Sequence, residues 1–83
     1  MDMRKLVGRN FRRLRTEKGL TQERFAELSG FSQQYVSDIE RGLRNPTVVT
    51  LYELAQALGT PPVALIQPDN EAYSVSGDTR TPP

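Results

Sequence analysis

Apolar residues recur along residues 1–67 at the three- and four-residue intervals that place one face of a helix against a core. In the first stretch Val7, Phe11 and Leu14 share one stripe, and Gly19 follows it. The later stretches are separated by glycine or proline. The pattern therefore predicts an all-α chain of five helices, at about residues 3–18, 22–29, 33–41, 48–58 and 63–67.

The same periodicity predicts which side chains are buried. It assigns inward positions in the second helix to Phe25 and Leu28. In the third and fourth helices it assigns them to Val36, Ile39, Val48, Leu51, Leu54, Ala55 and Leu58. Pro46 biases Asn45 away from helix, so a loop is expected between these two helices.

The second and third helices are joined by an unusual spacing, Gln22-x3-Ala26-x3-Gly30-x5-Val36. Ala26 is small enough to let a second helix cross closely. Gly30 falls just past the helix end, where a left-handed backbone costs glycine little. Thr21 and Ser32 precede the two helices as N-caps. This arrangement is typical of a helix-turn-helix, whose second helix enters the DNA major groove.

Length and composition limit the size of the domain and the classes of function that the chain can have. Eighty-three residues are expected to form one small domain, residues 1–67, followed by a polar, flexible tail, residues 68–83. The alternative for the tail is a packed extended segment that uses Tyr73 and Val75. The chain has no cysteine and no histidine, so neither a metal site, a cofactor site nor an enzyme is expected. No apolar run is long enough to cross a membrane and no signal-peptide pattern opens the chain, which favours a cytoplasmic protein.

Charge is distributed unevenly along the chain. Residues 1–18 carry a net charge of +5, residues 19–44 of −1, and the remainder of −3, within a total of +1. This asymmetry suits an N-terminal part that faces a polyanion. A merely solvated basic helix face would give the same counts.

Two stretches, Phe11 to Ala26 and Val36 to Pro46, resemble the Cro/repressor-type helix-turn-helix family, also called the xenobiotic-response-element family. Thr21-Gln22, the central Ala26 and Gly30, and Ile39-Glu40-Arg41-Gly42 carry the resemblance, which extends over about residues 6–66. It implies a compact five-helix, lambda-repressor-like DNA-binding domain that usually acts as a dimer.

Candidate base contacts lie at the start of the third helix, the end that points into the groove in this motif. Gln33 and Gln34 each carry an amide that can pair with adenine N6 and N7, which is worth about 1–3 kcal/mol of discrimination. Ser37 lies one turn beyond Gln33. Tyr35 is expected either to contact DNA or to pack on the second helix. Asp38 is expected either to accept from cytosine N4 or to hold an arginine.

Candidate phosphate contacts are polar or cationic groups at helix ends and in the loop after the third helix. They are Thr21, Gln22, Ser32, Arg41, Arg44 and Asn45. In relatives of the phage-repressor type, the glutamine equivalent to Gln22 supports the first glutamine of the third helix while it touches a phosphate.

Two further assignments concern structure and assembly. The resemblance implies that Arg15 and Glu40 form a partly buried ion pair between the first and third helices. Val63, Leu65 and Ile66 cannot all face inward from one short helix, so they are expected to provide a dimer interface. The alternative is that they only close the monomer core.

Together these features predict a sequence-specific regulator that binds double-stranded DNA, a dimeric repressor that contacts a palindromic operator through the third helix. A restriction–modification controller protein and an antitoxin are alternatives within the same class. A protein-binding module without DNA activity is the alternative outside it. Nothing in the sequence indicates a small-molecule ligand.

Overall fold

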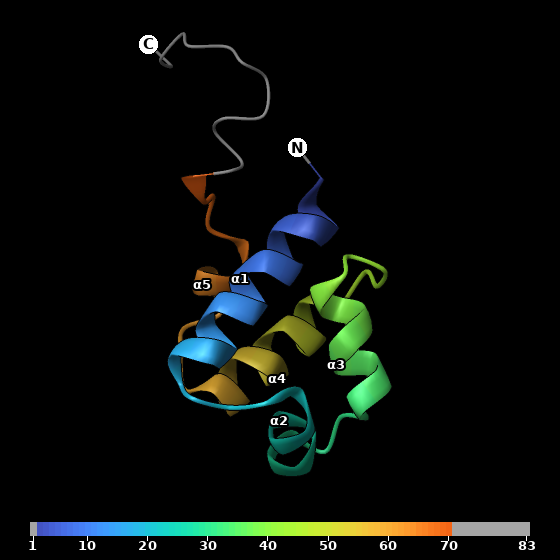
Figure 1. Cartoon of the computed structure of the whole chain (residues 1–83). Coiled ribbons are helices and arrows are strands. Elements are labelled where there is room, and N and C mark those ends of the chain that lie inside the picture. Colours follow the sequence, from blue (N-terminus) through green and yellow to red (C-terminus); the bar gives the residue numbers. More distant parts are fainter. Residues whose placement is uncertain (1, 71–83) are drawn as a thin grey trace, which may run out of the picture.

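The computed structural model describes residues 2–70 and contains five α-helices in that range, without strands (Figure 1). Their bounds are α1 (Met3–Glu17), α2 (Gln22–Ser29), α3 (Gln33–Glu40), α4 (Val48–Leu58) and α5 (Val63–Ile66). The all-α, five-helix prediction is confirmed. Three helices end one residue earlier than predicted, because Lys18, Arg41 and Gln67 are C-cap residues that lie only half within the helix.

Polar side chains define where the helices begin. Thr21 Oγ1 accepts a hydrogen bond from the backbone N–H of Arg24 at 3.0 Å, and Ser32 Oγ accepts one from Tyr35 at 3.0 Å. These bonds satisfy donors that the first helical turn leaves unpaired. At the other end of α2, Gly30 has φ of 85°, the left-handed conformation that the helix-turn-helix spacing predicted.

The core lies where α1, α2, α3 and α4 meet. Phe11 and Phe25 form its centre, with ring centroids 4.9 Å apart and ring planes at 86°. The other buried residues in this cluster are Val36, Ile39, Leu54, Ala55, Leu58 and, from α5, Leu65. Leu6 and Val7 of α1 are buried as well. Helix α1 packs against both α3 and α5, and α2 packs against α3 and α4. This packing holds α3 at one side of the molecule (Figure 1).

Two predicted core positions are wrong. Leu28 is 54% exposed, because it lies in the last turn of α2, at the edge of the region that packs against the core. Val48 is 82% exposed, because it is the first residue of α4. The first turn of that helix extends past the packed region, as the exposed Val49 also indicates. Helical periodicity gives the correct face but not the point where contact with the core begins.

A buried asparagine joins α5 to α1. Asn10 is fully buried, and its Nδ2 donates to the backbone carbonyls of Leu65 and Gln67, both at 2.9 Å. Beyond α5, both carboxylate oxygens of Asp69 accept hydrogen bonds from Arg9, at 2.8 and 3.0 Å. The chain is thus held on α1 as far as Asp69. Most of the predicted tail, residues 71–83, lies outside the described residues.

Helices α1 and α3 cross at Gly8. A Cβ at this position would lie 2.5 Å from the carbonyl oxygen of Ile39 and 2.7 Å from that of Glu40. Both are backbone atoms, so neither can move without shifting α3. Glycine therefore sets the distance between α1 and the helix expected to contact DNA.

We predict that Gly8→Ala destabilises the protein, although alanine favours helix by about 1 kcal/mol. Overpacking against the α3 backbone costs about 1–3 kcal/mol, so the melting temperature should fall in a thermal melt followed by circular dichroism. Arg12→Ala on the exposed face of α1 is the control and should change it little. A melting temperature of Gly8→Ala at or above that of the wild type would contradict the close crossing.

Candidate nucleic-acid interface

The N-terminal turn of α3 is exposed to solvent. Gln33 and Gln34 are both exposed, and with Gln22 and Ser37 they line an open depression of about 330 Å³. No large apolar side chain lines the depression. It brings together three of the candidate base contacts and one candidate phosphate contact, with amide and hydroxyl groups available at its surface.

Gln22 makes a different contact from the one that the resemblance implies. Its Nε2 donates to Glu40 Oε1 at 3.0 Å, rather than supporting Gln33. The physical reason is that a carboxylate is a stronger acceptor than an amide. Gln22 therefore connects α2 to the end of α3, and its Oε1 remains available to accept.

Tyr35 is held between two neighbours. Its ring stacks on Phe31 with centroids 5.3 Å apart and planes at 14°, and the Arg44 guanidinium lies 5.2 Å from its centroid. A tyrosine hydroxyl ordinarily keeps its proton at neutral pH, and partial burial raises the pKa of Tyr35 further, so this hydroxyl can donate. The ring thus packs on Phe31, in the turn that follows α2, and the predicted DNA contact of the hydroxyl stays a prediction.

Asp38 is bound by arginines, the second of the two roles predicted for it. Its Oδ1 accepts from Arg41 Nη2 at 2.9 Å, and its Oδ2 from Arg44 Nε at 3.2 Å. Oδ1 also accepts from Gln34 Nε2 at 2.8 Å. The bond from Gln34, and then those from the two arginines, hold the pKa of Asp38 below its ordinary value. The carboxylate is thus ionised at neutral pH.

The candidate phosphate contacts lie at the start of α2, at the start of α3 and after the end of α3. All are exposed except Gln22, which is half-buried. Thr21 and Ser32 lie at the starts of α2 and α3, where each side-chain oxygen accepts from the backbone and each hydroxyl hydrogen remains free to donate. Arg41, Arg44 and Asn45 follow α3, and the two arginine side chains are about half exposed, at 58% and 49%.

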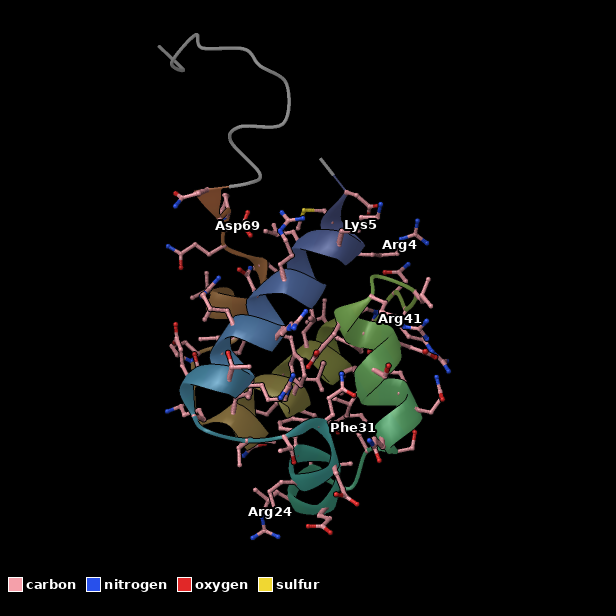
Figure 2. All side chains as sticks on the ribbon, viewed as in Figure 1. Arg4, Lys5, Arg24, Phe31, Arg41 and Asp69 are labelled. Carbon is pink, nitrogen blue, oxygen red and sulfur yellow. The ribbon has the colours of Figure 1, made fainter. Side chains whose placement is uncertain are left out.

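Two basic residues near α3 were not among the sequence-predicted contacts. A Cβ at Gly42 would lie 2.8 Å from Lys5 Cγ, so the start of α1 adjoins the end of α3. Figure 2 shows Arg4, Lys5 and Arg41 at the same end of the molecule. The positive charge of residues 1–18 was the available signal, but only the packing of α1 on α3 says which of its cations lie near Arg41.

Arg15 and Glu40 form a bidentate ion pair with side chains only 10% and 6% exposed. Arg15 Nε and Nη2 donate to the two carboxylate oxygens of Glu40, the latter bond measuring 3.1 Å. Arg15 Nη1 also donates to the Leu20 carbonyl at 2.6 Å. The pair is therefore well supplied with hydrogen bonds, as a buried pair must be to persist.

The residues predicted for a dimer interface divide into two groups. Val63 and Ile66 are exposed, at 57% and 41%. Leu65 is fully buried in the core of the monomer, so its assignment to the interface is wrong. A helix of one turn presents opposite faces within two residues, and α1 and α4 cover the face that carries Leu65.

Neither a metal-binding cluster nor a membrane-spanning helix occurs in residues 2–70. Within that range no group of three or more acidic, histidine or cysteine side chains could hold a metal ion. No helix in the same part of the chain combines the length and apolar character that a membrane crossing needs.

We predict that Glu40→Ala lowers the free energy of unfolding by about 3–5 kcal/mol, because Arg15 would remain buried without its partner. Urea denaturation measures this loss. Glu27→Ala breaks the exposed pair with Arg24 and should cost no more than about 0.5 kcal/mol. Equal effects of the two substitutions would show that the buried pair has no special structural role.

Comparisons with known proteins agree with this geometry. The model of the helix-turn-helix family HTH_3 matches residues 11–65. An uncharacterized HTH-type transcriptional regulator, y4dJ of Sinorhizobium fredii, is 70% identical over 71 residues, which cover 86% of this chain and 92% of that protein. These matches confirm the resemblance that the sequence motifs indicated.

Solved structures of similar fold include two regulators. The hypothetical transcription factor NHTF from Neisseria superposes with a TM-score of 0.78 at 32% identity, covering 89% of this chain and 85% of that one. The restriction-modification controller protein C.Esp1396I, a tetramer in complex with its natural 35 base-pair operator, gives a TM-score of 0.71 at 32% identity, covering 78% and 86%. The chain belongs to the HTH_3 family of DNA-binding helix-turn-helix transcriptional regulators, a non-enzymatic family, and is related to restriction-modification controller proteins.

Proposed function

We propose that this protein is a dimeric repressor that binds a palindromic operator in double-stranded DNA through α3. The observation that carries the proposal is the exposed pair Gln33 and Gln34 at the start of α3, with exposed arginines in the segment that follows the same helix. Amides at the leading end supply base discrimination, and guanidinium groups at the trailing end supply phosphate affinity.

Base contact is assigned to the depression at the start of α3. Gln33 and Gln34 present donor and acceptor groups side by side, the pattern that adenine requires in the major groove. Ser37 adds a hydroxyl one turn along the helix. Tyr35, which follows Gln34 but does not line the depression, adds a phenolic hydroxyl. These four residues are the proposed base contacts.

Phosphate contact is assigned to the groups that flank the depression. The starts of α2 and α3 offer the Thr21 and Ser32 hydroxyls together with helix N-termini, which favour anions. Gln22, the first residue of α2, lines the depression and has a free acceptor, and Arg41, Arg44 and Asn45 lie beyond the other end of α3. Contacts of this kind hold the protein in register on the duplex but carry no sequence information.

Dimerisation is assigned to α5. Val63 and Ile66 leave apolar side chains exposed on a helix that Asn10 holds firmly on α1. A two-fold dimer through this surface would place two α3 helices about 34 Å apart, at half-sites one turn of DNA apart. C.Esp1396I is a tetramer in complex with its operator, which supports self-association on DNA in general.

A controller protein of a restriction–modification system is the second candidate. The similarity to C.Esp1396I over 78% of this chain favours it over an antitoxin. Both candidates would bind DNA through α3, so the genes that adjoin the operator distinguish them.

Selection of bound fragments from a random duplex pool tests the DNA-binding function. We predict that the wild type enriches a palindrome, and that Gln33→Ala and Gln34→Ala each lose about 1–3 kcal/mol of discrimination at one base pair per half-site. Gln56→Ala, at an exposed glutamine of α4, is the matched control and should enrich the wild-type sequence. Failure of the wild type to enrich any sequence would refute the proposed function.

Sedimentation analysis without DNA tests the interface. We predict a dimer at concentrations on the order of tens of micromolar for the wild type, and a monomer for Val63→Asp or Ile66→Asp, because facing carboxylates would be buried without partners. Leu28→Asp introduces the same charge at an exposed leucine of α2 and should leave the dimer intact. A monomeric wild type, or dissociation by all three variants alike, would contradict the assignment to α5.

A further inference from the structure

One carboxylate on α3 joins three of the residues assigned to DNA. Asp38 accepts hydrogen bonds from Gln34 at 2.8 Å, Arg41 at 2.9 Å and Arg44 at 3.2 Å. Its side chain is only 13% exposed, because these three neighbours cover it. Gln34 comes from the first turn of α3, Arg41 caps the helix, and Arg44 lies in the loop. Asp38 thus links the proposed base contact to the proposed phosphate contacts.

The side chains around Asp38 carry more positive than negative charge. Two guanidinium groups face one carboxylate, so the cluster of Asp38, Arg41 and Arg44 keeps a net charge of +1 (two positive charges less one negative). The arginines would repel each other without the acid between them. An uncompensated acid at this place would repel DNA phosphates, whereas this one is neutralised by both neighbours.

The hydrogen bond to Asp38 also restricts the orientation of the Gln34 amide. The terminal torsion of glutamine has no strong intrinsic preference, so a free amide samples many orientations. Here one N–H of Nε2 is directed to Asp38. The bond uses only that donor, so the second N–H and the Oε1 acceptor stay available. One donor and one acceptor are what pairing with adenine N7 and N6 requires.

The arginines keep donors for phosphates while they are bound to Asp38. A guanidinium has five N–H groups. Arg41 uses Nη2 and Arg44 uses Nε in these bonds, so each retains several others. The face of Arg44 also rests on the Tyr35 ring. The cluster therefore orders these side chains before DNA arrives, which lowers the entropy lost on binding.

We propose that Asp38 is a positioning residue for DNA specificity, which orients the Gln34 amide and restrains Arg41 and Arg44. As a result, a larger share of the binding energy comes from base contacts and a smaller share from phosphate contacts. Asp38 acts through these three side chains and does not itself contact a base. The inference rests on the proposed function, since it assigns a role within the same DNA-binding surface.

Asp38→Asn tests the proposal, because it removes the charge and leaves the side chain almost unchanged in size. Fragments selected from random duplexes, and the affinities for the enriched and a scrambled duplex, are measured between about 50 and 200 mM salt. We expect about tenfold less discrimination at the base pair assigned to Gln34, because the neutral amide oxygen of asparagine is a weaker acceptor for Gln34 Nε2 than the carboxylate. The slope of log affinity against log salt should steepen by about 1, because the loss of the carboxylate leaves one more uncompensated positive charge facing the phosphates.

Two further variants separate charge from geometry. Asp38→Glu keeps the charge but moves the carboxylate by one methylene, so discrimination should fall while the salt slope stays close to that of the wild type. Glu27→Gln removes one negative charge from an exposed pair with Arg24 on α2, and should change neither quantity. Thermal melts of all variants report whether each is folded. If Asp38→Asn does not fold, Asp38→Glu tests the proposal in its place.

The outcomes distinguish the inference from the function on which it rests. If the wild type enriches a sequence and Asp38→Asn enriches it with equal discrimination and an equal salt slope, Asp38 has only a structural role and the inference is overturned. The same conclusion follows if Glu27→Gln reproduces the effects of Asp38→Asn, since charge alone would then explain them. A wild type that enriches no sequence overturns the proposed function itself.

Discussion

The buried ion pair between Arg15 and Glu40 is the constraint on which the position of α3 depends. Arg15 comes from α1, Glu40 from the end of α3, and the Leu20 carbonyl and Gln22 from the turn and helix between them. Three segments thus meet at one pair of charges. A buried pair tolerates little movement, because any separation leaves desolvated charge without a partner. Gly8 sets the distance at which α1 and α3 cross, and the ion pair fixes the position of α3 along α1.

Local signals were enough to predict most of the fold. The Thr21 cap and the Gly30 turn gave the bounds of α2 to the residue, because both depend on neighbours within a few positions. Leu28, Val48 and Leu65 were placed wrongly, because each depends on where one helix stops covering another. Periodicity gives the face of a helix, but the extent of burial is a tertiary property.

The candidate site was predictable only in part, because local sequence signals do not give contacts between separate segments. Exposure of Gln33 and Gln34 follows from their place at the start of a helix, which the motif locates. The partner of Gln22 and the threefold binding of Asp38 depend on distances between side chains of separate segments. The sequence raised the possibility that Asp38 binds an arginine. It contained no signal that two arginines and a glutamine share the same carboxylate.

The central claim is that the side-chain amides of Gln33 and Gln34 lie against base edges in the major groove. Nuclear magnetic resonance of the ¹⁵N-labelled protein, titrated with a duplex that it selects, measures this directly through contacts between the amide protons and base protons. We expect such contacts for these two glutamines, with large shifts of their side-chain amide signals. Unchanged amide signals at both residues, with the shifts confined to other helices, would contradict the claim.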